Sequence, residues 1–186
     1  SGVPADGGLA VTSQVGNVRG VCHAPDGSLY FSLYTTNRVY RISPEGRVYV
    51  VAGTGASGYS GDGGAATNAQ LYSPLKLALD SAGNLYIADY FNNRVRKVDT
   101  AGIITTVAGT GAASSSGDGG AATNAGIKYP TGLAFDPAGN LLISEYGSHR
   151  VRKVNPSGII STVAGNGVGT YAGDGGPAVN ASIRTG

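Results

Sequence analysis

The sequence has no methionine, no tryptophan and one cysteine among its 186 residues. A single cysteine, Cys22, excludes both an intramolecular disulfide and a zinc site built from several cysteines. Charge is also scarce, because 13 Lys and Arg against 11 Asp and Glu leave a net charge of only +2. Nucleic-acid affinity rests on clustered basic residues facing phosphates, so we expect no nucleic-acid partner.

Long apolar runs are missing as well. No stretch approaches the about 18 continuous apolar residues of a membrane-spanning helix, so we expect no membrane insertion. The first residues, SGVPADGG, lack the basic and apolar regions of a signal peptide, although a removed signal would leave no trace. What the chain has in excess is glycine, with 32 residues, more than twice the usual share of about 7%. This excess favours tight turns or a repeat over long helices.

The sequence repeats with a period of 56 residues. The tetrapeptide GDGG places Asp62, Asp118 and Asp174 at equal steps, and a related ADGG places Asp6 one step earlier. A period sustained along the chain is typical of repeat architectures. Three further columns keep the same phase: Tyr34, Tyr90 and Tyr146, then Arg38, Arg94 and Arg150, then Val39, Val95 and Val151.

The first copy diverges most from the others at two columns. Leu33 stands where the other copies have Asp89 and Glu145. Tyr40 stands where they have Arg96 and Arg152.

Each copy reads as four short strands. In the third copy they are Gly132–Phe135, Leu141–Glu145, Arg150–Val154 and Ile159–Ala164, separated by turn-forming sequences such as DPAGN and NPSG. Apolar residues occur at both odd and even positions along the strands, so both faces of each sheet carry apolar side chains, and this favours sheets covered on both faces. The sequence therefore predicts an all-β protein, a β-propeller built of four-stranded antiparallel blades with three blades per chain.

The repeat also predicts the domain boundaries. The blades are expected at 18–54, 74–110 and 130–166, with a partial linker copy at 1–17 and GDGG-containing linkers at 55–73, 111–129 and 167–186.

Two segments, Gly132–Val154 (GLAFDPAGNLLISEYGSHRVRKV) and Lys76–Val98 (KLALDSAGNLYIADYFNNRVRKV), resemble the NHL repeat. The linkers with GTG and GDGG are similar to a bacterial form of that family with long linkers. The resemblance implies a propeller, commonly six-bladed. It does not fix the activity, because family members include protein-binding and RNA-binding propellers, sensor domains of receptor kinases and a lyase.

Three blades span too little arc to close a ring, since propellers typically have four to eight. Two blade faces would remain bare, and apolar surface of that extent marks an interface. The leading hypothesis is a homodimer of three plus three blades. The alternatives are a fragment of a longer propeller and open units that stack into a larger assembly.

The second-to-third turns and the linkers share one end of an antiparallel meander, and we predict the ligand-binding face there. A protein, peptide or glycan ligand is expected. The candidate residues are Tyr34, Asp89, Tyr90, Asn93, Arg94, Glu145, Tyr146, His149 and Arg150.

Each candidate also has a structural interpretation. The GDGG aspartates, with Asp6, are expected to cap their own turns, and the spacing of acidic residues makes calcium only a weak expectation. The recurring arginines are expected in ion pairs, for example Arg94 with Asp89 and Arg150 with Glu145. The tyrosines are expected to pack between blades or to line a central funnel.

No catalytic centre is predicted. His149 with Glu145 and Tyr146 is the best set for acid–base chemistry, but the equivalents of His149 are Asn37 and Asn93, so a structural role is favoured. We expect a non-catalytic binding or scaffold module, extracellular, at the cell surface or periplasmic, without a cofactor. The alternatives are a lyase or hydrolase with a metal site near the axis, and a purely structural assembly unit.

Overall fold

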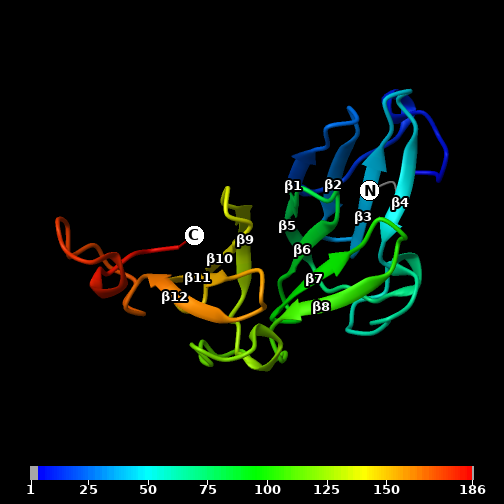
Figure 1. The fold of residues 1–186 in the computed structure, drawn as a ribbon. Helices are drawn as coiled ribbons and strands as arrows, with labels where there is room; N and C mark the ends of the chain where they lie inside the picture. The colour runs from blue at the N-terminus through cyan, green and yellow to red at the C-terminus, as the bar shows by residue number, and fades with distance from the viewer. Residues whose placement is uncertain (1–3, 186) are drawn as a thin grey trace.

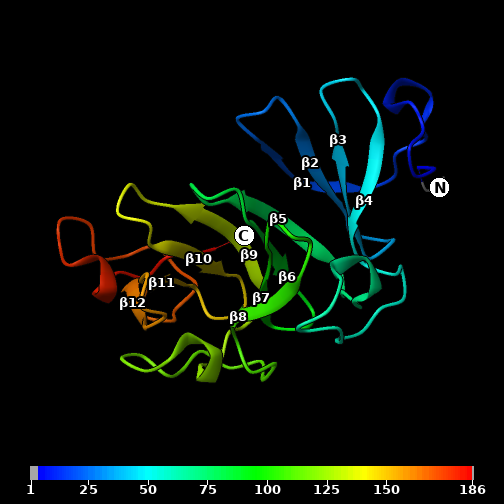
Figure 2. The same ribbon diagram turned by 45° about the vertical axis from the view of Figure 1, so that its right-hand side comes forward.

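Three antiparallel sheets of four strands follow one another along the chain, each in simple meander order. The computed structural model describes residues 4–185. Figures 1 and 2 show the sheets as successive blades of a fan, with blue and cyan, green, and yellow to orange ribbons. The prediction of four-stranded propeller blades, three per chain, is confirmed. Blade 1 contains β1 (Val18–His23), β2 (Leu29–Leu33), β3 (Arg38–Ile42) and β4 (Val48–Ala52); blade 2 contains β5 (Pro74–Leu79), β6 (Leu85–Asp89), β7 (Arg94–Val98) and β8 (Ile104–Ala108); blade 3 contains β9 (Pro130–Phe135), β10 (Leu141–Glu145), β11 (Arg150–Val154) and β12 (Ile160–Ala164).

The first strands of neighbouring blades lie against each other at the centre of the fan. Gly20 in β1 is close to β5, and a Cβ atom at this position would overlap the carbonyl oxygen of Leu75. Ser32 donates a hydrogen bond to the same carbonyl at 2.5 Å. A glycine is therefore required where the two inner strands approach most closely.

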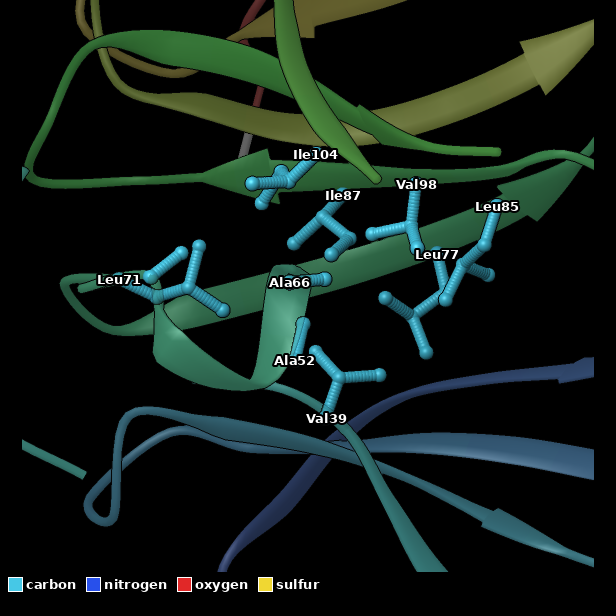
Figure 3. Packing of buried hydrophobic residues seen from close by; sticks show 10 residues of the cluster. Val39, Ala52, Ala66, Leu71, Leu77, Leu85, Ile87, Val98 and Ile104 are labelled. Carbon is cyan, nitrogen blue, oxygen red and sulfur yellow. The ribbon is translucent and has the colours of Figure 1, made fainter. Parts of the chain in front are cut away.

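The core lies in the gaps between blades. Between blades 1 and 2, Val39 and Ala52 face Leu77 and Ile87 across the linker residue Ala66 (Figure 3). We call the side of a blade that bears Ile87 its leading face and the side that bears Val95 its trailing face. The same kind of cluster fills the gap between blades 2 and 3. Each blade thus buries apolar side chains on both faces, as the apolar residues at odd and even strand positions predict.

Each linker runs from the outer strand of one blade to the inner strand of the next, and on its way it forms hydrogen bonds with the outer strand of that next blade. In the first complete linker, the Gly53 N–H donates to Ala66 O at 3.0 Å, which holds the short 3-10 turn η2 (Ala66–Asn68) against β4. The Ala66 N–H donates to Gly102 O at 2.8 Å, and the Ile104 N–H donates to Gly64 O at 3.0 Å, which ties the same linker to β8. The linker therefore also covers an edge strand that would otherwise present free backbone groups. The equivalent turns are η1 (Ala10–Thr12), η3 (Ala122–Asn124) and η4 (Ala178–Asn180).

Two blade faces are open. On the leading face of blade 1, Val21 is 52% exposed, whereas its equivalent Leu77 in blade 2 is 5% exposed. On the trailing side of blade 3, η4 is held by Gly165 and Asn166, yet Ala178 is exposed, whereas its equivalent Ala122 is 1% exposed. These two surfaces are the open leading face and the open trailing face.

Candidate functional site

The three recurring tyrosines converge on one shallow pocket. Each follows the last residue of a second strand, so the meander places Tyr34, Tyr90 and Tyr146 at the same end of their blades. The pocket has a volume of about 250 Å³, and the inner strands supply Arg19, Leu75 and Thr131. The Arg19 guanidinium lies 5.6 Å from the centroid of the Tyr34 ring. Burial, together with the neighbouring phenols, raises the pKa of Tyr90, so this hydroxyl stays protonated near neutral pH.

Asp89 and Glu145 do not belong to this surface, although the sequence placed them on the binding face. Both carboxylates are fully buried. Asp89 lies 3.5 Å from Arg96 Nη1, and Glu145 lies 3.0 Å from Arg152 Nη1. The predicted pairs with Arg94 and Arg150 are therefore wrong. Arg96 and Arg152 are cut off from water within their strands, so they need the buried carboxylates that end the neighbouring strands.

The GDGG aspartates complete these buried pairs. Asp62 lies 2.6 Å from Arg96 Nη2, and Asp118 lies 2.6 Å from Arg152 Nη2. The expectation that they cap their own turns is wrong, because their carboxylates bind an arginine of the following blade. Asp6 accepts a hydrogen bond from the Val50 N–H at 2.8 Å. Asp174 is exposed and has no ion pair within residues 4–185.

The electrostatics of this cluster differ between its two carboxylates. Burial raises the pKa of Asp89 to about 6, despite hydrogen bonds from Asn92 and the Tyr72 N–H and the charge of Arg96. Partial burial also opposes ionisation of Asp62, but a hydrogen bond with Thr106 and the charge of Arg96 hold its pKa below the usual value. One arginine is therefore shared by an inner carboxylate that resists ionisation and an outer one that favours it.

Arg94 and Arg150 bind the linkers. Arg94 donates to the carbonyls of Asn92 and Thr110, and its guanidinium lies 3.6 Å from the centroid of the Tyr59 ring. Arg150 donates to Asn166 O at 3.0 Å. These arginines stand at the ends of their strands, where linker carbonyls are within reach, so they need no carboxylate.

Asn93 connects neighbouring blades. Its side chain accepts a hydrogen bond from the Tyr129 N–H at 3.1 Å and donates to Gly111 O at 3.3 Å. His149 occupies the equivalent column in blade 3, and its buried Nδ1 has no partner within the described residues. The Glu145 carboxylate binds Arg152 and Ser148 rather than the His149 ring. The best sequence candidate for an acid–base pair is therefore not assembled.

No group of three or more His, Cys, Asp or Glu side chains that could hold a metal ion occurs in the described part of the chain. Burial raises the pKa of Cys22 to about 11, so its thiol is protonated at neutral pH and is a poor nucleophile. None of residues 4–185 forms a helix long and apolar enough to cross a membrane.

Sequence reasoning missed an aromatic cluster beside the tyrosine pocket. Tyr90 stacks on Tyr129 with ring centroids 5.1 Å apart, and Phe91 lies 4.8 Å from Tyr90. Tyr72 extends the cluster, with its ring 4.8 Å from that of Phe91. Three of these aromatics have non-aromatic equivalents in the other copies, so a search for recurring residues does not find them. Their departure from the repeat is the signal that could have found them. We call these four residues the aromatic strip.

Comparison with known proteins identifies the repeat. A model described as the Teneurin NHL domain matches residues 50–116, and a model of the NHL repeat matches residues 128–154. The chain belongs to the NHL-repeat family. Teneurin-1 of Gallus gallus is 35% identical to this NHL chain over 133 residues, which cover 62% of the chain and 5% of the teneurin. The Arabidopsis thaliana protein SUPPRESSOR OF QUENCHING 1 is 35% identical over 81 residues, 43% of the chain and 8% of that protein. The NHL chain thus spans a small part of these relatives.

Solved structures similar to this NHL chain share its fold. An auxiliary nutrient binding protein from Bacteroides thetaiotaomicron gives a TM-score of 0.61 at 17% identity, over 93% of this chain and 41% of that protein. Virginiamycin B lyase from Staphylococcus aureus gives a TM-score of 0.53 at 14% identity, over 86% and 42% of the two chains. The three NHL blades therefore correspond to somewhat less than half of each solved chain.

Proposed function

We propose that this NHL chain is a non-catalytic binding or scaffold module whose open blade faces associate with further blades to complete a ring. The single observation that carries the proposal is the contrast in burial between equivalent positions. Leu77 is 5% exposed and Ala122 is 1% exposed, whereas Val21 is 52% exposed and Ala178 is open to solvent. An apolar surface that is buried in one repeat and bare in the next favours a partner of the same shape.

The partner that we propose is a second copy of the chain, which gives a homodimer of three plus three blades. In such a ring the open trailing face of one copy meets the open leading face of the other at two equivalent junctions. Residues 4–17 occupy the same place on blade 1 that the linkers 55–73 and 111–129 occupy on blades 2 and 3. The Gly7 N–H, for example, donates to Val48 O at 2.7 Å. At each junction this segment and the partner's segment 167–183 therefore compete for one site, and closure requires that one of them moves.

The remaining parts of the proposal concern ligand and location. A protein, peptide or glycan ligand binds at the tyrosine pocket, whose open shape and phenol lining suit recognition rather than chemistry. An abundance of Gly and a low charge, with the GDGG linkers, favour a secreted, cell-surface or periplasmic bacterial protein. A lyase or hydrolase is disfavoured, because Glu145 is bound to Arg152 and does not contact the His149 ring.

The molar mass in solution tests the association. Light scattering after size exclusion is expected to give twice the 18.5 kDa chain mass. Val21→Lys places a charge on the open leading face and is expected to return the mass to that of one chain, because an unpaired charge cannot be buried at a junction. The matched control Ala101→Lys places the same charge at an exposed alanine in the β7–β8 turn of blade 2, away from both open faces, and is expected to leave the mass unchanged. A wild-type mass of 18.5 kDa at every concentration would contradict the homodimer.

A further inference from the structure

Three aromatic side chains of the aromatic strip occupy columns that the blade fold does not require to be aromatic. Tyr72, Phe91 and Tyr129 stand there, and Phe91 and Tyr72 are 40% and 41% exposed. The other copies fold into the same blade and linker with small or polar residues in these columns. Those residues are Gly16 and Lys128 for Tyr72, Thr35 and Gly147 for Phe91, and Asn17 and Ser73 for Tyr129.

The strip is continuous. Ring centroids are 4.8 Å apart for Tyr72 and Phe91, 4.8 Å for Phe91 and Tyr90, and 5.1 Å for Tyr90 and Tyr129. Tyr129 has a positive φ of 53°, a region that bulky residues rarely adopt, and Ser73 adopts φ 55° in the same column. An aromatic ring is therefore held on a backbone site that a serine fills equally well.

The strip leads into the tyrosine pocket through Tyr90, which belongs to both. Arg19 is exposed and lines this pocket, and no side-chain carboxylate of residues 4–185 lines it, because Asp89 and Glu145 are buried against Arg96 and Arg152. The side chain of Lys128 packs beside Tyr129 over Gly147. The surface therefore combines exposed aromatic rings with cations and favours a ligand that is anionic.

We propose that the aromatic strip and the tyrosine pocket bind an acidic, proline-rich segment of another protein in the polyproline II conformation. Grooves lined by aromatic side chains accept the ridges of such a helix, which is already extended before it binds. Tyrosine hydroxyls donate hydrogen bonds to its carbonyls, and prolines have no N–H groups that would need acceptors. Acidic side chains of the segment pair with Arg19 and Lys128.

A glycan is the less favourable occupant. Its many hydroxyl groups need several carboxylate or amide partners, and the nearby polar side chains are already used. Asn92 donates to Gly58 O and to the buried Asp89, and Asn93 donates to Gly111 O. Sugar hydroxyls on the strip would therefore lose water without replacement.

This inference rests on the proposed role as a binding module, but all of its residues belong to one chain. A strictly monomeric protein would contradict the ring and leave this site intact. The two proposals therefore fail in distinguishable ways.

Fluorescence anisotropy with labelled synthetic peptides tests the proposal on the full chain. Peptides of repeated Pro-Pro-Glu triplets are expected to bind, peptides of Pro-Pro-Ser triplets more weakly, and peptides of Gly-Ser-Glu triplets at least about tenfold more weakly than the first. Oligogalacturonate serves as the acidic glycan probe and is expected to bind more weakly than Pro-Pro-Glu.

The variants replace strip residues with those that the chain itself uses elsewhere. Phe91→Thr with Tyr129→Ser imports the residues of blade 1 and of the preceding linker, and is expected to weaken Pro-Pro-Glu binding at least about tenfold. Arg19→Leu imports the residue of blade 2 and is expected to reduce the preference for Pro-Pro-Glu over Pro-Pro-Ser, with Lys128 left as the remaining cation. The matched control is Tyr171→Ser, since Tyr171 is 88% exposed and lies outside the strip, and it is expected to bind as wild type does.

The proposal is overturned if Pro-Pro-Glu and Gly-Ser-Glu peptides bind equally or if neither binds. It is also overturned if the Phe91 and Tyr129 double variant binds like wild type, or if oligogalacturonate binds more tightly than the peptide. Circular dichroism of each variant against wild type confirms that the blades are folded in the sample that was titrated.

Discussion

The leading faces of blade 1 and blade 2 solve the same packing problem with different chemistry. In blade 2, Asp89 and Arg96 lie 3.5 Å apart with no exposed side-chain surface. In blade 1, Leu33 and Tyr40 stand at these two positions, and Tyr40 stacks on Phe31 with centroids 5.3 Å apart. The backbone is the same in both, so the fold tolerates either a buried ion pair or an apolar cluster, provided that both members of the pair change together.

The difference extends to the linkers. In blades 2 and 3 the preceding linker supplies an aspartate at 2.6 Å from the buried arginine. In blade 1 no arginine stands at position 40, and among the described residues the equivalent Asp6 side chain accepts a hydrogen bond from the Val50 N–H instead. The ion pair therefore ties a linker to a particular blade, and an apolar cluster does not.

The largest effect is expected from removing one partner of the buried pair. Arg96→Met leaves Asp89 buried without its counter-charge and should lower the free energy of unfolding at pH 7 by about 3–5 kcal/mol. Urea denaturation of wild type and variant at pH 7 measures this loss of unfolding free energy. The control is Tyr40→Met in blade 1, which leaves no charge behind. Equal losses in the two variants would show that the arginine contributes packing alone.

The second effect is a pH dependence that arises from the buried pair of blade 2. Asp89 has a pKa of about 6 in the folded state, above its usual value of 3.8. Its protonated form therefore stabilises the fold below about pH 4, and this stability is lost as pH rises through about 6. Relative to Asp89→Asn, wild type should lose about 2–3 kcal/mol between pH 4 and pH 7.

Denaturation of wild type and Asp89→Asn at several pH values measures this difference, in which the other titrating groups largely cancel. A constant difference across the range contradicts the raised pKa. The opposite slope would mean that Arg96 lowers the pKa of Asp89 more than burial raises it.

A smaller effect is expected when both members change together. Asp89→Leu combined with Arg96→Tyr gives blade 2 the two residues that blade 1 has at these positions. The free energy of unfolding of this double variant should lie within about 1–2 kcal/mol of that of wild type, so the double variant should be more stable than Arg96→Met. A double-mutant cycle with the two single substitutions measures the coupling. Additive single effects would show that the two columns act independently and that their joint divergence in the first copy is coincidental.

The smallest effect is expected from Tyr40→Phe. The Tyr40 hydroxyl is buried and has no hydrogen-bond partner within the described residues. Its removal should leave stability unchanged or raise it by up to about 1 kcal/mol. Thermal unfolding measures the change, and a clear loss would indicate that an ordered water binds this hydroxyl. Tyr49→Phe, at a tyrosine that is 37% exposed in β4, is the matched control.

The sequence predicts the strands and their order because the repeat presents each strand three times with the same turn residues. The pairing of Asp89 was not predictable in the same way. Arg94 lies directly opposite Asp89 in the ladder, whereas Arg96 lies opposite Ile87, so the simplest pairing rule selects the wrong arginine. The two arginines differ in burial: Arg94 stands at the strand end and reaches Thr110 O, whereas the fully buried Arg96 lies between Asp89 of its own blade and Asp62 of the linker. The joint change to Leu33 and Tyr40 in the first copy is a sequence signal for the true pair, and the prediction did not use it.

The candidate site was predictable only where it follows the repeat. The column of Tyr34, Tyr90 and Tyr146 does line a common pocket. Tyr72, Phe91 and Tyr129 break the repeat, so a search for recurring residues passes over them. Their contact depends on the path of a linker in space, which no local pattern encodes.

The linkers have a consequence for how the molecule comes apart. Each packs against the outer strand of one blade and forms hydrogen bonds with the outer strand of the next, while the inner strands of blades 1 and 2 meet at Gly20 and Leu75. Neighbouring blades are thus in contact through both their outer and their inner strands, and both contacts are lost when one of the two blades unfolds. We therefore expect adjacent blades to unfold together. The free energy of unfolding should then increase with each added blade by the contribution of one further interface between neighbouring blades.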